Sequence, residues 1–579
     1  MGNVSYPLVH IETQEGKMGI FEKVRLYFNE RIEYKRWELV KYALVSLCIF
    51  LPGLGRFFHY FTLSCLLCFV AFFCLCFGFL VLFRVKRKYL TPFIALGLLG
   101  FAYQLGIGKP FGYQMLTAIY ETNHREMFGF LGTPMGIPLV LGGIAALAFV
   151  LWLIAGEKPL PFLHKQTFIR RKYLMPFLLL SALLFCVTRW EVCQTYPVCL
   201  FYNNFMYIDE NIAIADYRDN PYECPREFRP NEQLGETYIL VIGESARRLS
   251  LSSYGYERET SPELDKMLKD KPGNLALFSD AISTAAFTKA SVMSIYSPLT
   301  VNEELSSLHT KPGLSKIFKG SGFSTLYVTT RPKYAIRNML STFLDDAQKT
   351  AYLTSLTKRK FDGEMLPLIS DFIKDTPGKK FIIVHLMGSH FEYAAQYPGE
   401  FKYFHAGRKV IDAYDNSLRY TDHVLAELLR EALQNKEPVC MLYVSDHGEN
   451  LNDKNDGNYG HGTRELTVYE LRVPFIVYFN DVFIAQHVSS CARVVANKEK
   501  PISHDNIAHT LMGLAGISDP AVYRSEFDIS AAGFNPGPRF ITDENMNPYE
   551  YESFDFSRKN RFAEIKESLA EKYRSKFTW

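Results

Sequence analysis

The sequence predicts an α-helical membrane domain of five spans, followed by a soluble α/β domain with a mostly parallel central sheet. Three observations support this prediction. The composition changes near Glu191, from long apolar runs to that of an ordinary globular protein. The first part contains five apolar runs of membrane-spanning length. The second part alternates short β-branched strands with amphipathic helical segments, which is typical of a sheet covered on both faces.

The five apolar runs are candidate transmembrane helices. Each is close to the ~20 residues that a helix needs to cross the hydrocarbon core, and a single signal peptide does not explain five of them. They cover residues 38–57, 59–83, 89–107, 137–156 and 173–190. None carries a charged residue in its middle, so a transporter or pump is disfavoured and a membrane anchor is favoured. The first run is the least regular, because Pro52, Gly53 and Gly55 interrupt it.

The loops indicate the orientation of these spans. Lys and Arg are frequent in the amino-terminal arm, residues 1–37, and in the loops after the second and fourth spans. Because such residues accumulate on the cytoplasmic side, the amino terminus is expected inside. An odd number of spans then places everything after Trp190 outside the cytoplasm.

The net charge bears on possible ligands, and the cysteine content bears on possible disulfides. The formal net charge is +3, which gives no reason to expect nucleic-acid binding. Six of the eleven cysteines lie in the predicted spans and five lie after them. The odd number leaves at least one thiol unpaired, and Cys440, in a predicted buried strand, is expected to be free. Cys193 and Cys199 could pair, but sequence alone does not fix the pairing.

The second part begins with a proline-rich connector, residues 191–235, and the predicted α/β domain occupies 236–579. The predicted strands are "TYILVIG" (237–243), "STLYVTT" (324–330), "KFIIVHLMG" (380–388), "VCMLYVS" (439–445) and "VPFIVYF" (473–479). Residues 415–434 between them show apolar side chains at helical spacing. The segment 562–573 reads as a surface helix.

Carboxylates and imidazoles follow several of these strands. Glu244 ends the first, His390 follows the third, Asp446 and His447 follow the fourth, and His461 lies in a later loop, "YGHG". Each residue alone could be a cap or a solvated turn. In parallel sheets, however, ligands bind beyond the carboxyl ends of the strands. Their coincidence at one edge therefore indicates a site.

The residue types in this set favour zinc, which takes Glu, Asp and His ligands and keeps one position open in catalytic sites. Neighbours on a regular strand point to opposite faces, so Asp446 and His447 could reach one ion only from an irregular turn. Gly448 would permit such a turn.

Four ordered blocks resemble the bacterial phosphoethanolamine transferases that modify lipopolysaccharide. They are "VIGESARRLSLSSYGYERETSPELD", "VHLMGSHFEYAAQYP", "AYDNSLRYTDHVLAELL" and "YVSDHGEN". These transferases are inner-membrane enzymes with five spans and a sulfatase-like periplasmic domain of the alkaline phosphatase superfamily. The segment "GYQMLTAIYETNHREMFGFL" is similar to their amphipathic segment between spans three and four. Within it, Glu121–Glu126 is either a simple interfacial helix or a cover over the lipid. The resemblance implies a bacterial inner-membrane protein with its catalytic domain in the periplasm.

The resemblance also implies the site residues. The family uses a zinc-bound threonine nucleophile, here in the loop "FSDAISTAAFTKASVMSIYSP", and its spacing favours Thr288 over Thr284. Glu244, Asp446 and His447 would hold Zn²⁺ with Thr288 in the open position. His390 and His461 would bind the phosphate and act as acid or base. The loop lacks the Cys-Gly-Thr and Pro-Cys surroundings of members that modify lipid A, which argues against assuming that acceptor.

The implied reaction has two displacements. Thr288 would take phosphoethanolamine from phosphatidylethanolamine, and a hydroxyl or phosphate of lipopolysaccharide would then accept it. The sequence does not identify the acceptor, which could be lipid A, Kdo, a core heptose or a periplasmic glucan.

Two alternative functions remain: a glycerophosphotransferase or phosphodiesterase acting on a periplasmic glycan, and a non-enzymatic membrane sensor with a decayed site. A true sulfatase is disfavoured because residues 281–298 contain no Cys/Ser-x-Pro-x-Arg motif. Arg247 and Arg248 either contact substrate or cover the surface, the latter being favoured.

Overall fold

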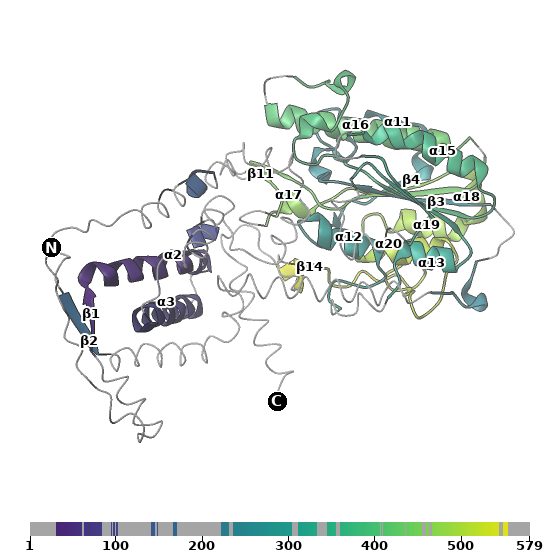
Figure 1. Cartoon of the computed structure of the whole chain (residues 1–579). Helices are drawn as coiled ribbons and strands as arrows, with labels where there is room; N and C mark the ends of the chain where they lie inside the picture. The colour runs from purple at the N-terminus through teal and green to yellow at the C-terminus, as the bar shows by residue number, and fades with distance from the viewer. Residues whose placement is uncertain are drawn as a thin grey trace. The chain divides into compact units, whose positions relative to one another are not determined.

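The computed structural model describes residues 31–60, 63–83, 94, 97–98, 100–101, 140–144, 148, 166–170, 222–230 and, with short gaps, 235–553 (Figure 1). The gaps fall at 304–310, 333–343, 345, 355–358, 406, 408, 435, 454–458, 463–465 and 543–547. The chain divides into two compact units. One contains Met1–Phe111 and Phe130–Tyr202, and the other contains Gly112–Gly129 and Asn203–Trp579.

Several sequence predictions fall outside the described residues. They are most of the amino-terminal arm, nearly all of spans three to five, the segment Glu121–Glu126, most of the connector, the Cys193–Cys199 pair and the helix at 562–573. The domain boundaries at 37/38, 190/191 and 235/236 stay predictions.

The described part of the first unit includes two long helices and one strand pair. Helix α2 spans Arg36–Tyr60 and α3 spans Leu63–Phe83, and they pack together through the stacked rings of Phe50 and Phe72, 5.2 Å apart. Strands β1 (Arg31–Lys35) and β2 (Gln166–Arg170) pair in antiparallel fashion. Among the helices that the structure describes, none combines the length and the apolar character that crossing a membrane requires.

A seven-stranded sheet forms the centre of the second unit. In spatial order its strands are β4 (Leu275–Leu277), β12 (Phe475–Phe479), β9 (Val439–Ser445), β3 (Thr237–Gly243), β8 (Lys380–His385), β6 (Ser324–Thr329) and β7 (Lys349–Tyr352). The prediction of a mostly parallel sheet is confirmed, and all five predicted strands are present. Only β12 runs antiparallel to its neighbours. Strands β4 and β7 are short additions that the sequence did not predict.

Helices cover both faces of this sheet, as Figure 1 shows. One face carries α12 (Thr288–Tyr296), α13 (Leu314–Gly320), α19 (Val488–Ala496) and α20 (Asp505–Leu514). The other carries α11 (Pro262–Asp270), α15 (Leu366–Asp375) and α16 (Lys409–Ala432). Because strand residues alternate between faces, the wholly buried β3 supplies both cores.

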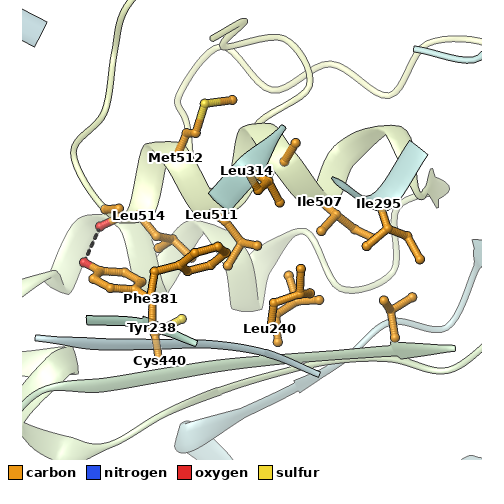
Figure 2. Packing of buried hydrophobic residues seen from close by; sticks show 14 of the residues in the cluster. Tyr238, Leu240, Ile295, Leu314, Phe381, Cys440, Ile507, Leu511, Met512 and Leu514 are labelled. Atoms are coloured by element: carbon orange, nitrogen blue, oxygen red, sulfur yellow. Dashed lines mark hydrogen bonds between the residues drawn. The ribbon is translucent and has the colours of Figure 1, made fainter. Parts of the chain in front are cut away.

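Figure 2 shows the core between β3 and α20. Tyr238 and Leu240 point from the sheet toward Leu511 of the helix. The Tyr238 hydroxyl donates to the Leu514 carbonyl at 3.0 Å, so the buried phenol is satisfied. Cys440 of β9 lies in this core as a free buried thiol, which confirms its prediction.

Two glycines let the loops at the carboxyl edge of the sheet approach one another. Gly388, after β8, has φ +50°, and a Cβ there would lie 2.8 Å from the Glu244 nitrogen. A Cβ on Gly448, after β9, would lie 2.0 Å from the Tyr469 carbonyl oxygen. Gly448 is therefore required for close backbone approach and not for a positive φ; at this edge Gly388 and Ser245, at +57°, have positive φ.

Candidate metal centre

The carboxyl ends of β3 and its two neighbours carry most of the predicted site residues. Strand β3 lies between β8 and β9. Glu244 directly follows β3, and Asp446 and His447 directly follow β9. His390 follows β8 after a short turn. The sheet topology thus brings to one edge side chains that are far apart in the sequence.

Thr288 lies within hydrogen-bond reach of two of these side chains. Its Oγ1 is 3.2 Å from Glu244 Oε2 and 3.3 Å from His447 Nε2. Thr288 is also the first residue of α12. The amino terminus of a helix favours negative charge, so a hydroxyl at this position is well placed to become an oxyanion or to carry a phosphate.

Asp446 has one oxygen held by the backbone and one oxygen free. Its Oδ1 accepts hydrogen bonds from the backbone N–H of Ser245 at 3.0 Å and of His447 at 2.7 Å. Its Oδ2 is buried, has no hydrogen-bond partner among the described residues and lies 3.4 Å from His447 Nε2. A buried carboxylate oxygen without a donor is costly unless a cation faces it.

The pKa values of the buried site residues are shifted in different directions. Burial raises the pKa of Glu244, but the charges of Arg331 and of the neighbouring histidines together outweigh burial and hold this pKa well below its usual value. Burial and the adjacent charge of Glu244 raise the pKa of Asp446 far above its usual value. Burial and the charge of His461 lower the pKa of His447 to about 3, so its imidazole is neutral and able to bind a metal.

These residues fit a divalent metal ion. Glu244, His447 and His461 place ligand atoms within 4.8 Å of one another, and the partnerless oxygen of Asp446 faces the same imidazole. The raised pKa of Asp446 reflects the cost of holding both buried carboxylates ionised without a further cation. Carboxylate oxygens and imidazole nitrogens are the donors that zinc takes in catalytic sites.

His461 reaches the site through a small hairpin, formed by β10 (Asn450–Leu451) and β11 (Tyr459–Gly460). Its ring lies 3.9 Å from that of His447. Its Nδ1 bonds Glu449 Oε2 at 2.8 Å, and the other oxygen of Glu449 accepts from the Tyr393 hydroxyl at 2.7 Å. Burial alone would lower the pKa of His461, but the charge and hydrogen bond of Glu449 raise it to about 9.

Other predicted residues lie apart from this cluster. Thr284 is fully buried, 3.1 Å from Ser294 Oγ, and does not join the carboxylates. His390 lies at the rim, partly buried, and its charge lowers the pKa of Glu244. The expectation that both arginines after β3 lie on the surface is wrong for Arg247. It is buried and pairs with Asp453 at 2.8 Å.

Two residues of the site were not predicted from the sequence. Arg331 follows Thr330 at the end of β6 and pairs with Glu244. Glu449 lies two residues after His447 and orients His461. The strand-end rule that identified Glu244 applies equally to Arg331, since β6 is parallel to β8 and ends at the same edge.

A comparison with protein families decides the class of the domain. Residues 236–517 match the family model described as sulfatase. This part of the chain is therefore similar to the sulfatase family. The solved crystal structure of the C-terminal periplasmic domain of EcEptC from Escherichia coli, in complex with zinc, is 25% identical. It has a TM-score of 0.52 and covers 58% of this chain and 98% of that chain.

Relatives of residues 236–517 and of the sequence before them are transferases. Phosphoethanolamine transferase EptC of Escherichia coli (strain K12) is 28% identical over 510 residues, which are 79% of this chain and 83% of the relative. Phosphoethanolamine transferase EptA of Helicobacter pylori is 26% identical over 474 residues, 74% of this chain and 81% of the relative. The resemblance to bacterial phosphoethanolamine transferases is confirmed.

The fold likeness extends beyond residues 236–517. The structure of the integral membrane protein lipooligosaccharide phosphoethanolamine transferase A from Neisseria meningitidis is 18% identical and has a TM-score of 0.63. It covers 84% of this chain and 97% of that chain. At this identity, the likeness concerns the fold.

Proposed function

We propose that this chain transfers phosphoethanolamine from phosphatidylethanolamine to a hydroxyl or phosphate of lipopolysaccharide, in its core or lipid A. One observation carries the proposal. The Thr288 hydroxyl lies 3.2 Å and 3.3 Å from two candidate metal ligands, at the start of a helix, in a chain whose relatives are phosphoethanolamine transferases. A nucleophile beside a metal site is the arrangement that phosphoryl transfer needs.

The proposed metal is zinc. Glu244, Asp446 and His447 would hold it, with Thr288 in the remaining position. Zinc, when bound, lowers the pKa of an oxygen that it contacts and offsets negative charge on a reacting phosphate. The titration of the ligands agrees with this role, because His447 is neutral and Glu244 is ionised near neutral pH.

The proposed reaction then needs two steps from the residues of the chain. In the first step, Thr288 Oγ1 gives its proton to solvent and attacks the phosphorus of the donor lipid. The bond between this phosphorus and the diacylglycerol oxygen breaks, and His461 donates a proton to that oxygen. A pKa of about 9 keeps His461 protonated at neutral pH for this purpose. In the second step, the acceptor oxygen attacks the same phosphorus and gives its proton to the neutral His461. The Thr288 oxygen leaves and is reprotonated. His390, at the rim, would bind the phosphate.

A lipid donor explains a membrane location. We propose that residues 38–190 form a five-span anchor in the bacterial inner membrane, with the catalytic domain in the periplasm. The antiparallel pairing of β1 with β2 supports the orientation. It joins the amino-terminal arm to the loop after the proposed fourth span, and the positive charges of both segments favour the same, cytoplasmic side. The fold likeness to an integral membrane protein gives further support.

Mass spectrometry of lipopolysaccharide from cells with and without this protein tests the proposal. We expect one phosphoethanolamine to be lost when the gene is deleted, and fragmentation to locate it on a sugar or phosphate. An unchanged lipopolysaccharide, together with an altered periplasmic glucan, would favour the glycerophosphotransferase alternative. The decayed sensor is excluded if the wild-type gene restores the modification and an inactive variant does not.

We expect Glu449→Gln to lower the transfer rate about 10- to 100-fold at pH 8, the range typical of groups that orient a site residue. Removing the negative charge lowers the pKa of His461 from about 9 toward its ordinary value. The protonated acid is then lost at a lower pH, so the alkaline limb of the pH–rate profile should move down. The measurement is that profile for the purified protein.

Tyr393→Phe is the matched control for this variant. It removes the hydroxyl that bonds the other oxygen of Glu449 but keeps the charge beside His461. We expect a smaller loss of rate and an alkaline limb close to that of the wild type. An unchanged profile in Glu449→Gln would contradict the orienting role.

A further inference from the structure

Ser245 has a left-handed backbone conformation immediately after the candidate ligand Glu244. Its φ is +57°, in a region that residues with a Cβ rarely adopt. Such a conformation persists only where surrounding contacts hold it. Ser245 is fully buried, in the turn that leads from Glu244 to Arg247. The contacts that hold this turn therefore bear on where the Glu244 carboxylate lies.

Hydrogen bonds hold the backbone on both sides of Ser245. Before it, the Ser245 N–H donates to Asp446 Oδ1 at 3.0 Å. After it, the peptide that joins Ser245 to Ala246 is held at both ends. Its N–H donates to Ser445 Oγ at 2.8 Å, and its carbonyl accepts from the Tyr414 hydroxyl at 2.6 Å. Rotation about φ and ψ of Ser245 turns this peptide, so a relaxed backbone would have to break both bonds.

Tyr414 reaches this turn from α16, an element outside the sheet. It is fully buried, and it lies in one apolar cluster with Ala246 and with Leu418 on the same helix face. Its hydroxyl donates to the Ser245 carbonyl and accepts from the Arg247 backbone N–H at 3.0 Å, so it bridges the two ends of the turn. Burial raises the pKa of Tyr414 well above its ordinary value, so the hydroxyl keeps the proton that it donates.

The ring of Tyr414 also contacts the support of His461. It lies edge-on to the ring of Tyr393, with 5.1 Å between the ring centres. The Tyr393 hydroxyl bonds Glu449, and the other oxygen of Glu449 bonds His461. Tyr414 therefore supports two sides of the candidate metal centre, through backbone groups on one side and a second tyrosine on the other.

We propose that Tyr414 is a positioning residue, whose hydroxyl holds the strained peptide after Ser245 in the orientation that the metal centre needs. In that orientation, Glu244 and Asp446 can bind one divalent ion. The Ser245 N–H fixes one oxygen of Asp446 and leaves Oδ2 for the ion. The inference rests on the proposed function for the identity of the ion, zinc. A tyrosine that only stabilises the fold would leave the zinc affinity of the folded protein unchanged.

Tyr414→Phe in the full chain, in detergent micelles, tests this role. The variant keeps the ring and loses the hydroxyl. Zinc affinity is measured by competition with a chromophoric chelator, at a temperature at which circular dichroism shows the variant to be folded. We expect the affinity to fall about 10- to 100-fold, as is typical when a group that orients a ligand is lost. Unchanged zinc affinity would overturn the inference.

Ser245→Gly and Ser245→Ala separate backbone strain from other effects. Both remove the bond from Ser245 Oγ to Glu244 Oε1, so this loss cancels when the two are compared. Glycine adopts a positive φ without penalty, whereas the Cβ of alanine disfavours it about 5- to 30-fold. Apparent affinity follows the fraction of molecules that keep the strained turn.

The two substitutions are compared with and without the Tyr414 hydroxyl. In the Tyr414→Phe background, Ser245→Gly should bind zinc more tightly than Ser245→Ala, by up to this factor. With Tyr414 present the turn is held, so the same two variants should differ less. Equal zinc affinities in the Tyr414→Phe background would contradict a role in holding the strained turn.

Tyr254→Phe is the matched control. The Tyr254 hydroxyl likewise donates to a backbone carbonyl and accepts from a backbone N–H, both of Phe475 in β12. Its loss should leave zinc affinity unchanged. Zinc binding that depends on Tyr414, without any transfer to lipopolysaccharide, would reject the proposed function alone. Transfer by the wild type, with a zinc affinity that does not depend on Tyr414, would reject the inference alone.

Discussion

Thr288→Ala is expected to reduce phosphoethanolamine transfer by at least about 10³-fold, because losing a nucleophile removes the covalent route and leaves only binding and electrostatic assistance. The protein should stay folded, since Thr288 is partly exposed at the first residue of α12 and, among the described residues, its hydroxyl bonds Glu244 and His447 alone. The measurement is transfer from a fluorescent phosphatidylethanolamine. Intact-protein mass spectrometry should detect phosphoethanolamine on the wild type and none on the variant.

Thr284→Ser is the companion to this experiment. Thr284 lies in the same loop, but it is fully buried and bonds Ser294 instead of the metal ligands. Serine keeps that hydroxyl, so transfer should persist. Transfer that survives Thr288→Ala but is lost in a folded Thr284→Ala variant would move the nucleophile to Thr284.

The second large effect is expected for Asp446→Asn, which should abolish zinc binding and yet stabilise the metal-free protein. Burial and the charge of Glu244 raise the pKa of Asp446 far above its unfolded value. The folded state therefore prefers the protonated form, and the ionised carboxylate costs stability that grows as the pH rises above about 4. Asparagine removes this cost, and its Oδ1 can still accept from Ser245 and His447.

Thermal unfolding measures both parts of this result. With a chelator at pH 7, the melting temperature of Asp446→Asn should exceed that of the wild type by a few degrees, about 2–4 °C per kcal/mol for a domain of this size. Zinc at a hundred times its dissociation constant should stabilise the wild type by about 2.7 kcal/mol and the variant not at all. Asp528→Asn, at a buried carboxylate outside the site, should keep the response to zinc. A variant that still gains stability from zinc would contradict the role of Asp446.

The sequence predicted the positions of the main strands but not the direction of each strand in the sheet. Residues 473–479 are as apolar and β-branched as the parallel strands, so nothing in their composition shows that β12 runs antiparallel. Strands β4 and β7, of three and four residues, are too short for a periodic pattern. Residues 237–243 were identifiable because their unbroken apolar run is buried on both faces.

From the residue pattern alone, the site residues that could be predicted were those that directly follow a strand. Glu244, Asp446 and His447 follow strands directly, so the sheet brings them together. Thr288 starts a helix and was identified through the resemblance to a family. Glu449 lies in the quoted block "DHGEN", but no periodicity in that irregular loop shows that its side chain turns toward His461.

The position of β9 in the sheet has a consequence for how the enzyme is made. Strand β9 lies directly beside β3, although β6, β7 and β8 come between them in the chain. About two hundred residues separate the two carboxylate-bearing turns, and the hydrogen bond from Ser245 to Asp446 spans 201 positions. A chain whose residues beyond β8 are not yet folded can form the early strands but offers only part of the set of candidate ligands. The candidate metal centre is therefore complete only after β9 has joined the sheet.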